Sequence, residues 1–406
     1  MPPSQPDVVV VGAGASGLMA GATAAARGLR TLVLERRSLP GQRLMVSCMG
    51  AGAVSNTGLE VSRFHGREAR FVSDALQALP ADDLCHWFAA AGAELHDLPH
   101  YGLVAPEGGG AAAVAALVDA LHQAGGELRL DTIVRGARHS GDAIELDAGP
   151  SGLLQPRALV LATGGAHMPR LGGGTENFDL ARSLGHTVSP LRPGQVPLRL
   201  FAPWLEDVTG LWMEVRLRLW DGARCVAEST GSMLLAKGVA TGEAVFNLSR
   251  HCDRSGLELG ICFFPEREPE QVDEWLFRTL GERTREPVAR ALDNIIPLSL
   301  ATAFLRKLTI KRTARVQELS LLQRKRLLAD MLDLRLPVAG TLGWQAAEST
   351  LGGVAVREVD PRTFASRKTP GLYLAGRMLD VAGDWGGFEQ HFALASGFVA
   401  GRMVLA

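Results

Sequence analysis

Three glycines near the start of the chain have the spacing of a nucleotide-binding turn. Gly12, Gly14 and Gly17 follow four consecutive valines, and Glu35 closes a second apolar run 18 residues after Gly17. Gly12 permits a tight turn, Gly14 lets the backbone approach a pyrophosphate, and Gly17 lets the next helix pack on the sheet. Phosphates then lie at a helix N-terminus, where free N–H groups and the helix dipole favour negative charge. Because Glu35 can accept hydrogen bonds from a ribose, the pattern predicts a dinucleotide site that prefers FAD or NAD to NADP.

The surroundings of this triplet distinguish it from a chance match. Since 47 of the 406 residues are glycine, an ordinary tight turn is the alternative, but a strand, a helix and an acid stand at the expected places. The 19 uncharged residues from Val8 to Ala26 also have the length of a membrane helix or a signal-peptide core. Residues 1–7 contain no Lys or Arg, and four glycines weaken a lone helix. We therefore expect a soluble, cytoplasmic protein with no membrane partner.

A second glycine turn follows a later apolar run. Ala158–Leu161 leads into Thr163, Gly164 and Gly165. Ligands of a doubly wound sheet lie across the carboxyl ends of its strands, where so small a turn lets the backbone approach them. These three residues are candidate cofactor contacts, and a plain strand-end turn is the alternative.

The C-terminal segment has two features that suit a flavin. A short apolar strand ends at Gly376, and Asp380 beyond it can accept a hydrogen bond from a ribityl hydroxyl. An apolar helix then starts at Gly386 and Gly387, where free N–H groups can face the pyrimidine edge, on which negative charge develops during reduction. The alternative is an ordinary helix that docks on the first domain.

Composition and charge narrow the class of protein. The length of 406 residues predicts two or three domains, and a net charge of −1 gives no general reason to bind nucleic acid. The five cysteines form no C-x-x-C pair, which argues for a reducing compartment and against disulfides or a metal site. A basic cluster between Lys307 and Arg326 lies in a region rich in acids, so solvated helix faces are favoured over a nucleic-acid patch.

The middle of the chain has a different pattern of predicted secondary structure. Residues 195–202 and 213–230 read as antiparallel strands, the second with a hairpin turn at Asp221 and Gly222. Residues 266–333 read as helices. Before the second glycine turn, residues 127–134 read as a strand that follows an apolar helix over 111–124.

Together these features resemble the two-dinucleotide-binding-domain flavoproteins. Within them the chain is similar to the BaiN-like flavoproteins, also called the aminoacetone-oxidase-type FAD family. The segments that carry this resemblance are Leu184–Thr187 with Pro193 and Val196–Leu198, Leu351–Val354, Glu358–Pro361, Leu372–Gly376, Leu379–Val381 and Gly386–Phe388.

The resemblance implies an α/β fold in which a Rossmann-like FAD-binding domain is interrupted by a small antiparallel β-barrel domain that carries a helical insert. We expect the FAD-binding domain over residues 1–190 and 352–406, the barrel over 191–264 and 327–351, and the insert over 265–326. The residues implied to bind FAD include Val134 through its backbone. They are Gly12, Gly14, Gly17, Glu35, Arg36, Gly41, Arg43, Val134, Thr163, Gly164, Gly165, Gly376, Asp380, Gly386 and Gly387.

Several residues depart from the family pattern. Where the family has a Gly-Gly-Gly-Arg-Cys-Asn loop beside the flavin, this chain has Cys48–Ala53. Where the family has Glu after an Ala-Gly pair, this chain has Arg377 after Ala375-Gly376. The family's Thr-His element in the barrel is replaced by Ala236-Lys237, and the Gln that the family has in the last helix is replaced by His391. Because these changes fall where substrate is expected, the sequence predicts retained FAD binding with a changed substrate or chemistry.

The favoured function is that of an FAD-dependent oxidoreductase that moves a hydride between the flavin and a small organic substrate. NAD(P)H-dependent reduction of an activated C=C bond is the first hypothesis, with NAD(P)H bound transiently because no second glycine fingerprint exists. The alternatives are a flavin oxidase of amine-type substrates that uses O2 and, more remotely, a flavoprotein that acts on RNA or has no catalytic activity.

Three residues are candidates for acid–base or nucleophilic chemistry. His391 is the first, because an unperturbed pKa of about 6.5 suits proton transfer near neutrality. A structural histidine is the competing interpretation. Tyr101 and Cys48 are weaker candidates, and a lone buried cysteine is more often an inert small apolar residue.

Overall fold

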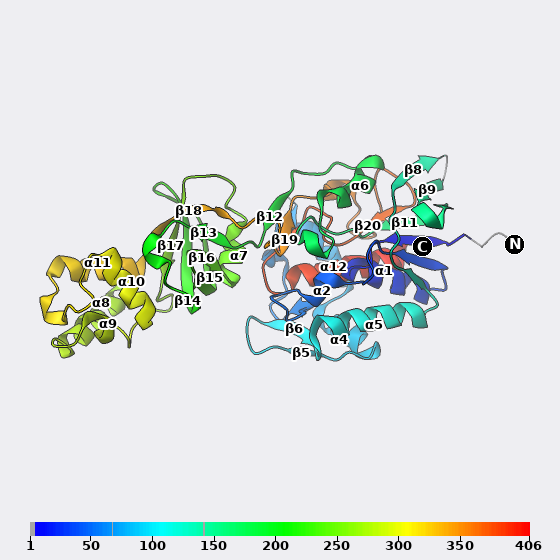
Figure 1. Cartoon of the computed structure of the whole chain (residues 1–406). Coiled ribbons are helices and arrows are strands. Elements are labelled where there is room, and N and C mark those ends of the chain that lie inside the picture. The colour runs from blue at the N-terminus through cyan, green and yellow to red at the C-terminus, as the bar shows by residue number, and fades with distance from the viewer. Residues whose placement is uncertain (1–4, 67, 141–142) are drawn as a thin grey trace. The chain divides into compact units, whose positions relative to one another are not determined.

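The computed structural model describes residues 5–66, 68–140 and 143–406 (Figure 1). The chain forms two compact units. The first runs up to Gly194 and resumes at Ala347, and the second spans Gln195–Ala346. The first unit contains the glycine turns from both ends of the sequence, so it holds the candidate cofactor site.

A five-stranded parallel sheet forms the centre of the first unit. Its order is β20 (Leu372–Leu374), β11 (Ala158–Leu161), β1 (Val8–Val11), β2 (Thr31–Leu34) and β7 (Glu127–Arg129). All residues of β1, β2 and β11 are buried. Strands buried on both faces read as continuous apolar runs, which explains the four valines of β1. The register brings the carboxyl ends of β1, β2 and β11 to the same edge.

Three helices pack side by side against this sheet. Helix α1 (Ala15–Ala26) lies between α5 (Gly109–Gln123) and α12 (Phe388–Met403) (Figure 1). A Cβ atom on Gly17 would lie 1.8 Å from the carbonyl oxygen of Gly12, so only glycine permits this packing. Helix α12 is buried over most of its circumference, as expected of a core helix. The two ends of the chain are thereby joined in one core.

The remaining elements of the first unit surround the sheet. Its further helices are α2 (Gln42–Met45), α3 (Ser73–Ala78), α4 (Ala81–Ala90) and α6 (Asp179–Ser183). Its further strands are β3 (Ser55–Asn56), β4 (Phe64–His65), β5 (Leu95–Asp97), β6 (Leu103–Pro106), β8 (Gly136–Ser140), β9 (Ala143–Asp147), β10 (Leu153–Leu154), β12 (Arg192–Gly194), β19 (Ser349–Leu351) and β21 (Ala382–Gly383).

The second unit is a closed antiparallel barrel with helices inserted between two of its strands. The barrel order is β13 (Leu198–Leu200), β16 (Val239–Thr241), β15 (Arg224–Ala236), β14 (Leu211–Asp221), β17 (Leu257–Cys262) and β18 (Leu334–Thr341). Helix α7 (Glu243–Ser249) packs on it. The inserted helices are α8 (Pro269–Glu282), α9 (Val288–Ala291), α10 (Leu298–Lys307) and α11 (Leu321–Leu332).

This architecture confirms the expected fold class. In β14, Val215, Leu217 and Leu219 are buried and alternate with more exposed polar residues, as a half-buried strand requires. Buried residues of the barrel and of the inserted helices form one continuous apolar core. The boundaries between barrel and helical insert stay a prediction. Among the described residues, no helix combines the length and apolar character needed to cross a membrane.

Two expected strands are shorter in the structure. Strand β7 ends at Arg129, because the backbone N–H groups of Asp131 and Thr132 donate to the carbonyls of Arg37 and Glu35 instead of continuing the ladder. This turn carries residues 132–135 over the end of β2 and toward the candidate site. Strand β13 covers only Leu198–Leu200, where it pairs with both β16 and β18.

Candidate functional site

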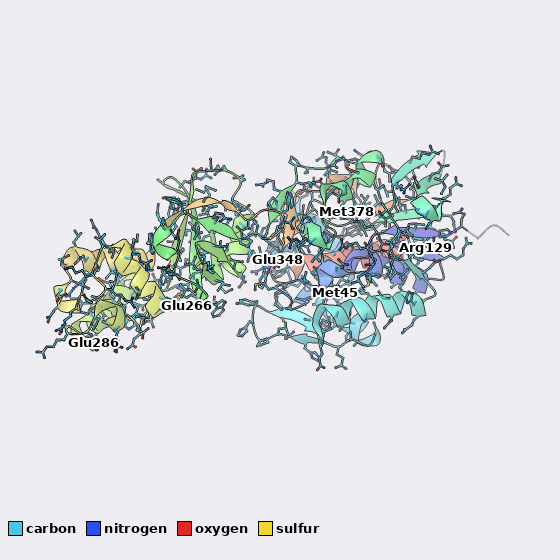
Figure 2. All side chains as sticks on the ribbon, in the orientation of Figure 1. Met45, Arg129, Glu266, Glu286, Glu348 and Met378 are labelled. Carbon is cyan, nitrogen blue, oxygen red and sulfur yellow. The ribbon has the colours of Figure 1, made fainter. Side chains whose placement is uncertain are left out.

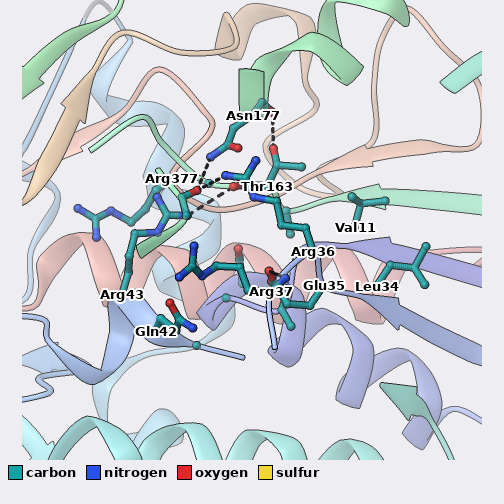
Figure 3. Close-up of a pocket in the computed structure, with 18 of the residues that line it drawn as sticks. Val11, Leu34, Glu35, Arg36, Arg37, Gln42, Arg43, Thr163, Asn177 and Arg377 are labelled. Carbon is teal, nitrogen blue, oxygen red and sulfur yellow. Dashed lines mark hydrogen bonds between the residues drawn. The ribbon is translucent and has the colours of Figure 1, made fainter. Parts of the chain in front are cut away.

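A cleft of about 410 Å³ opens at the carboxyl ends of β1, β2 and β11 (Figure 3). Small-molecule sites commonly measure roughly 300–1,000 Å³. The cleft is lined by the first glycine turn, Glu35, Arg43, the Thr163–Gly164 turn and Arg377. Segments more than 300 residues apart in the sequence therefore share one cleft.

Glu35 ties the glycine turn to the end of β2. Its Oε2 atom accepts a hydrogen bond from the N–H of Ala13 at 2.8 Å, and its Oε1 atom accepts from the N–H of Arg37 at 3.0 Å. Each carboxylate oxygen has a further lone pair. Glu35 can thus orient the turn and still accept from the hydroxyls of a ribose, and this donor and acceptor pattern fits the adenosine half of FAD.

The start of α1 has the properties of a phosphate site. Gly14 is the N-cap residue, and no side chain caps the first turn of the helix. A Cβ atom built on Gly14 would meet no protein atom within 4 Å. Open space therefore lies beside the free N–H groups of the helix start, where a diphosphate is stabilised. On this observation the residues present fit FAD.

Arg43 holds the second glycine turn in place. Its guanidinium donates to the carbonyl oxygens of Gly165 at 2.9 Å and Thr163 at 3.4 Å. Burial lowers the pKa of Arg43 to about 10, and the nearby charge of Arg377 acts in the same direction. Arg43 remains a cation at neutral pH and complements an anionic ligand in the cleft.

The predicted FAD contacts divide into two sets in the structure. Nine of them line the cleft: Gly12, Gly14, Glu35, Arg36, Gly41, Arg43, Val134, Thr163 and Gly164. Six lie outside its lining: Gly17, Gly165, Gly376, Asp380, Gly386 and Gly387. Gly17 packs on Gly12, and Gly387 approaches the backbone of Ser55. Cofactor binding by these residues stays a prediction.

Cys48 is buried at the start of the altered loop. Burial raises the pKa of its thiol to about 12, although the N–H groups of Gly386 and Gly387 donate to the sulfur and partly offset this rise. The thiolate is the reactive form of cysteine. The structure therefore favours the inert interpretation of Cys48, and a chemical role stays a prediction without support from geometry.

His391 is fully buried and both of its ring nitrogens have partners. Nδ1 lies 2.9 Å from the hydroxyl of Ser55, and Nε2 lies 2.8 Å from the carbonyl oxygen of Leu79. Burial lowers the pKa of His391 to about 4, so the ring is neutral at pH 7. Nε2–H donates to Leu79 and Nδ1 accepts from Ser55 in this state. This geometry favours a structural role over proton donation.

Tyr101 borders the start of α12. Its ring packs edge-on against Trp385 with centroids 5.4 Å apart, and its backbone has a φ of 64°. The side chain of Asn56 donates to the carbonyl oxygens of both Tyr101 and Gly386 at 2.8 Å. Tyr101 thus lies near the predicted flavin end of the site, and a role for its hydroxyl stays a prediction.

A charged cluster that the sequence did not reveal lies beside Arg377. Arg377 pairs with Glu389 at 2.7 Å and donates to the backbone carbonyl of Glu348. The indole N–H of Trp385 donates to Oε2 of Glu348 at 2.8 Å. Arg377 was visible in the sequence as a departure from the family, whereas no motif marks Glu348 or Glu389. In the described part of the chain, no group of three or more His, Cys, Asp or Glu side chains could hold a metal ion.

Comparison with known proteins identifies the family. The model of the HI0933-like protein Rossmann domain matches residues 6–403. The chain is 28% identical over 402 residues to the 3-dehydro-bile acid delta(4,6)-reductase of Clostridium scindens, covering 97% of both chains. It is 26% identical over 411 residues to the ribosomal RNA dihydrouridine synthase of Escherichia coli, covering 98% of both.

Among solved structures, the 3-ketosteroid-delta4-(5alpha)-dehydrogenase of Rhodococcus jostii is 17% identical with a TM-score of 0.47, covering 98% of this chain and 97% of that one. The family match spans nearly the whole chain and confirms the resemblance inferred from the motifs. The chain belongs to the HI0933-like Rossmann family and is an FAD-dependent oxidoreductase.

Proposed function

We propose that the protein reduces an activated C=C bond of a small organic substrate with electrons from NAD(P)H. The observation that carries this proposal is the cleft that leads from Glu35 to Arg377, where cationic and acidic side chains gather. When bound, FAD would supply the hydride chemistry between the nicotinamide and one carbon of the substrate. The relative from Clostridium scindens is named as a delta(4,6)-reductase, which supports the same type of reaction here.

The chain's own residues would bind and orient the two reactants. Glu35 and the start of α1 would hold the ribose and the phosphates, and Arg43 would keep the Thr163–Gly164 turn against the cofactor. Arg377, fixed by Glu389, would present a cation where the substrate's carbonyl oxygen becomes negative. A carbonyl conjugated to the C=C bond is therefore the expected activating group.

Anaerobic mixing distinguishes a reductase from an oxidase. We expect NADH or NADPH to bleach the flavin absorbance of the purified protein rapidly, and an α,β-unsaturated ketone to restore it. Stopped-flow absorbance measures both steps. Bleaching only by an amine, with peroxide formed in air, would contradict the reductase and identify the oxidase.

A second candidate function is the reduction of a base in RNA. Residues 306–326 contain eight Lys or Arg and one acid, a formal net charge of +7. Lys311, Arg312, Lys325 and Arg326 in this segment are exposed, whereas Arg306 and Lys307 form ion pairs with Asp207 and Asp330. Relatives from Escherichia coli and Haemophilus influenzae are named ribosomal RNA dihydrouridine synthases. The exposed Lys and Arg side chains of this segment favour contacts to RNA phosphates, and such contacts contribute most of the affinity of a protein for RNA.

Salt dependence tests this candidate. If RNA binds here, the double variant K325Q/R326Q should bind ribosomal RNA more weakly and lower the salt slope of log K by about 1 for each lost contact. The matched control is R285Q/R290Q, which removes two exposed arginines from the acidic part of the helical region. Equal slopes for the wild type and both double variants would eliminate the RNA hypothesis.

A further inference from the structure

Glu348 is a half-buried residue to which the predicted cofactor contacts assign no role. It lies directly before β19 in the same compact unit as the cleft (Figure 2). Trp385, which precedes α12, donates its indole N–H to Oε2 of Glu348 at 2.8 Å. A partly buried carboxyl group with a raised pKa, held in one orientation beside a cleft, is a candidate functional group.

Arg377 connects this carboxyl group to the cleft. The cleft lining includes both Glu35 and Arg377, and the close-up places these two side chains on different sides of it (Figure 3). Arg377 also donates to the backbone carbonyl of Glu348. If FAD binds with its adenosine ribose at Glu35, its flavin end would lie on the side of Arg377 and Glu348.

We propose that Glu348 is the proton donor of the reduction, an inference that rests on the proposed function. The C=C bond receives a hydride at one carbon, and the electron pair of its π bond takes the proton of the Glu348 carboxyl group at the other carbon. The substrate gains two electrons and two hydrogens, the nicotinamide is the reductant, and the Glu348 carboxylate regains its proton from water.

The surroundings of Glu348 suit a carboxylic acid that keeps its proton. Burial raises the pKa of Glu348, and the nearby charge of Glu389 adds to this rise. Trp385, Arg377 and the N–H of Met49 oppose the rise without cancelling it. The Cys48 thiol, also close by, stays protonated. Glu348 therefore holds a larger share of protons at neutral pH than an exposed glutamate does.

The geometry around His391 does not favour it as the proton donor. Its two nitrogens are occupied by Ser55 and Leu79, and burial keeps its ring neutral. The Glu348 carboxyl group is oriented by the indole N–H of Trp385 and by the N–H of Met49, and in its protonated form its O–H remains available as a donor. Proton transfer from a positioned acid contributes about 10²–10⁴-fold to a rate.

The protonation of Glu348 can be measured without turnover. In protein labelled with ¹³C at the glutamate side-chain carboxyl, we expect a signal that titrates above the ordinary value of about 4.3 and that is missing in E348Q. W385F removes a hydrogen bond to the carboxylate and should move this titration to higher pH. A Glu348 signal that titrates at or below the ordinary value would overturn the proposal.

Rapid kinetics test the step itself. In E348Q we expect NADH or NADPH to reduce the flavin at the wild-type rate, while reoxidation by cyclohexenone slows by about 10²–10⁴-fold. E348D should recover part of the rate, and flavin content and thermal unfolding check the fold of each variant. The control is E358Q, since Glu358 pairs with Lys368 and Thr187 and does not line the cleft.

The two proposals fail in different ways. A wild-type protein that NAD(P)H cannot reduce would refute the proposed function, and the titration would still report on Glu348. A wild type that reduces cyclohexenone together with an E348Q that does so equally fast would overturn only the role of Glu348.

Discussion

Replacing Gly14 with valine should give a folded protein that does not retain FAD. Gly14 has a φ of −81° and a ψ of −174°, which any residue adopts, and a Cβ there meets no protein atom within 4 Å. The valine side chain would occupy the space that the pyrophosphate needs. Loss of even two charge-assisted hydrogen bonds, each worth about 1.5–3 kcal/mol, weakens binding at least about 100-fold. Flavin absorbance and FAD titration of the apoprotein measure this effect.

Gly17 provides the matched contrast to Gly14. A Cβ on Gly17 would lie 1.8 Å from the carbonyl oxygen of Gly12, so G17A should fail to fold or should unfold at a much lower temperature. Circular dichroism and thermal unfolding therefore separate the two glycines, because G14V should unfold like the wild-type apoprotein. A G14V protein that purifies with bound FAD at the wild-type affinity would show that the pyrophosphate does not lie at this turn.

Stability should fall steeply as the pH decreases from 6.5 to 4, in part because of His391. Burial lowers its pKa to about 4 in the folded protein, whereas in the unfolded chain it is near 6.5. Between these values the unfolded state binds the extra proton, so acid favours unfolding. The difference corresponds to about 3 kcal/mol that is present above pH 6.5 and lost by pH 4.

Urea unfolding at several pH values measures this contribution. We expect H391N to be less stable at pH 7 and to lose less stability between pH 6.5 and 4 than the wild type does. The exposed His96 offers the control, and H96N should follow the wild-type curve. Parallel curves for the wild type and H391N would mean that His391 is not held neutral in the folded protein.

The central sheet and the nucleotide turns could be read from the sequence because their signals are local. Four valines, a glycine triplet and an acid at the end of the next strand predict β1, α1 and β2 within a few dozen residues, and the structure contains these elements at those positions. The alternation in residues 213–219 likewise predicted the barrel strand β14. Such patterns are visible because backbone geometry repeats every two or 3.6 residues.

Other local patterns were misleading. The apolar character of residues 127–134 suggested one strand, but the backbone turns after Arg129 to bond with Arg37 and Glu35. No periodicity can report a hydrogen bond to a residue almost a hundred positions away. The same limit applies to His391, whose hydrogen-bond partners Ser55 and Leu79 lie 336 and 312 residues away in the sequence.

The sequence by itself determined the Rossmann-like fold, the family and the segments that meet at the sheet edge. Only the tertiary structure decided how the pKa values of the titratable groups there are shifted. It places Glu348 beside Trp385 and Arg377 and encloses the buried His391 between two hydrogen-bond partners. The physical reason is that a pKa depends on hydration and on neighbouring charges, and both are set by segments that folding brings together from distant parts of the chain.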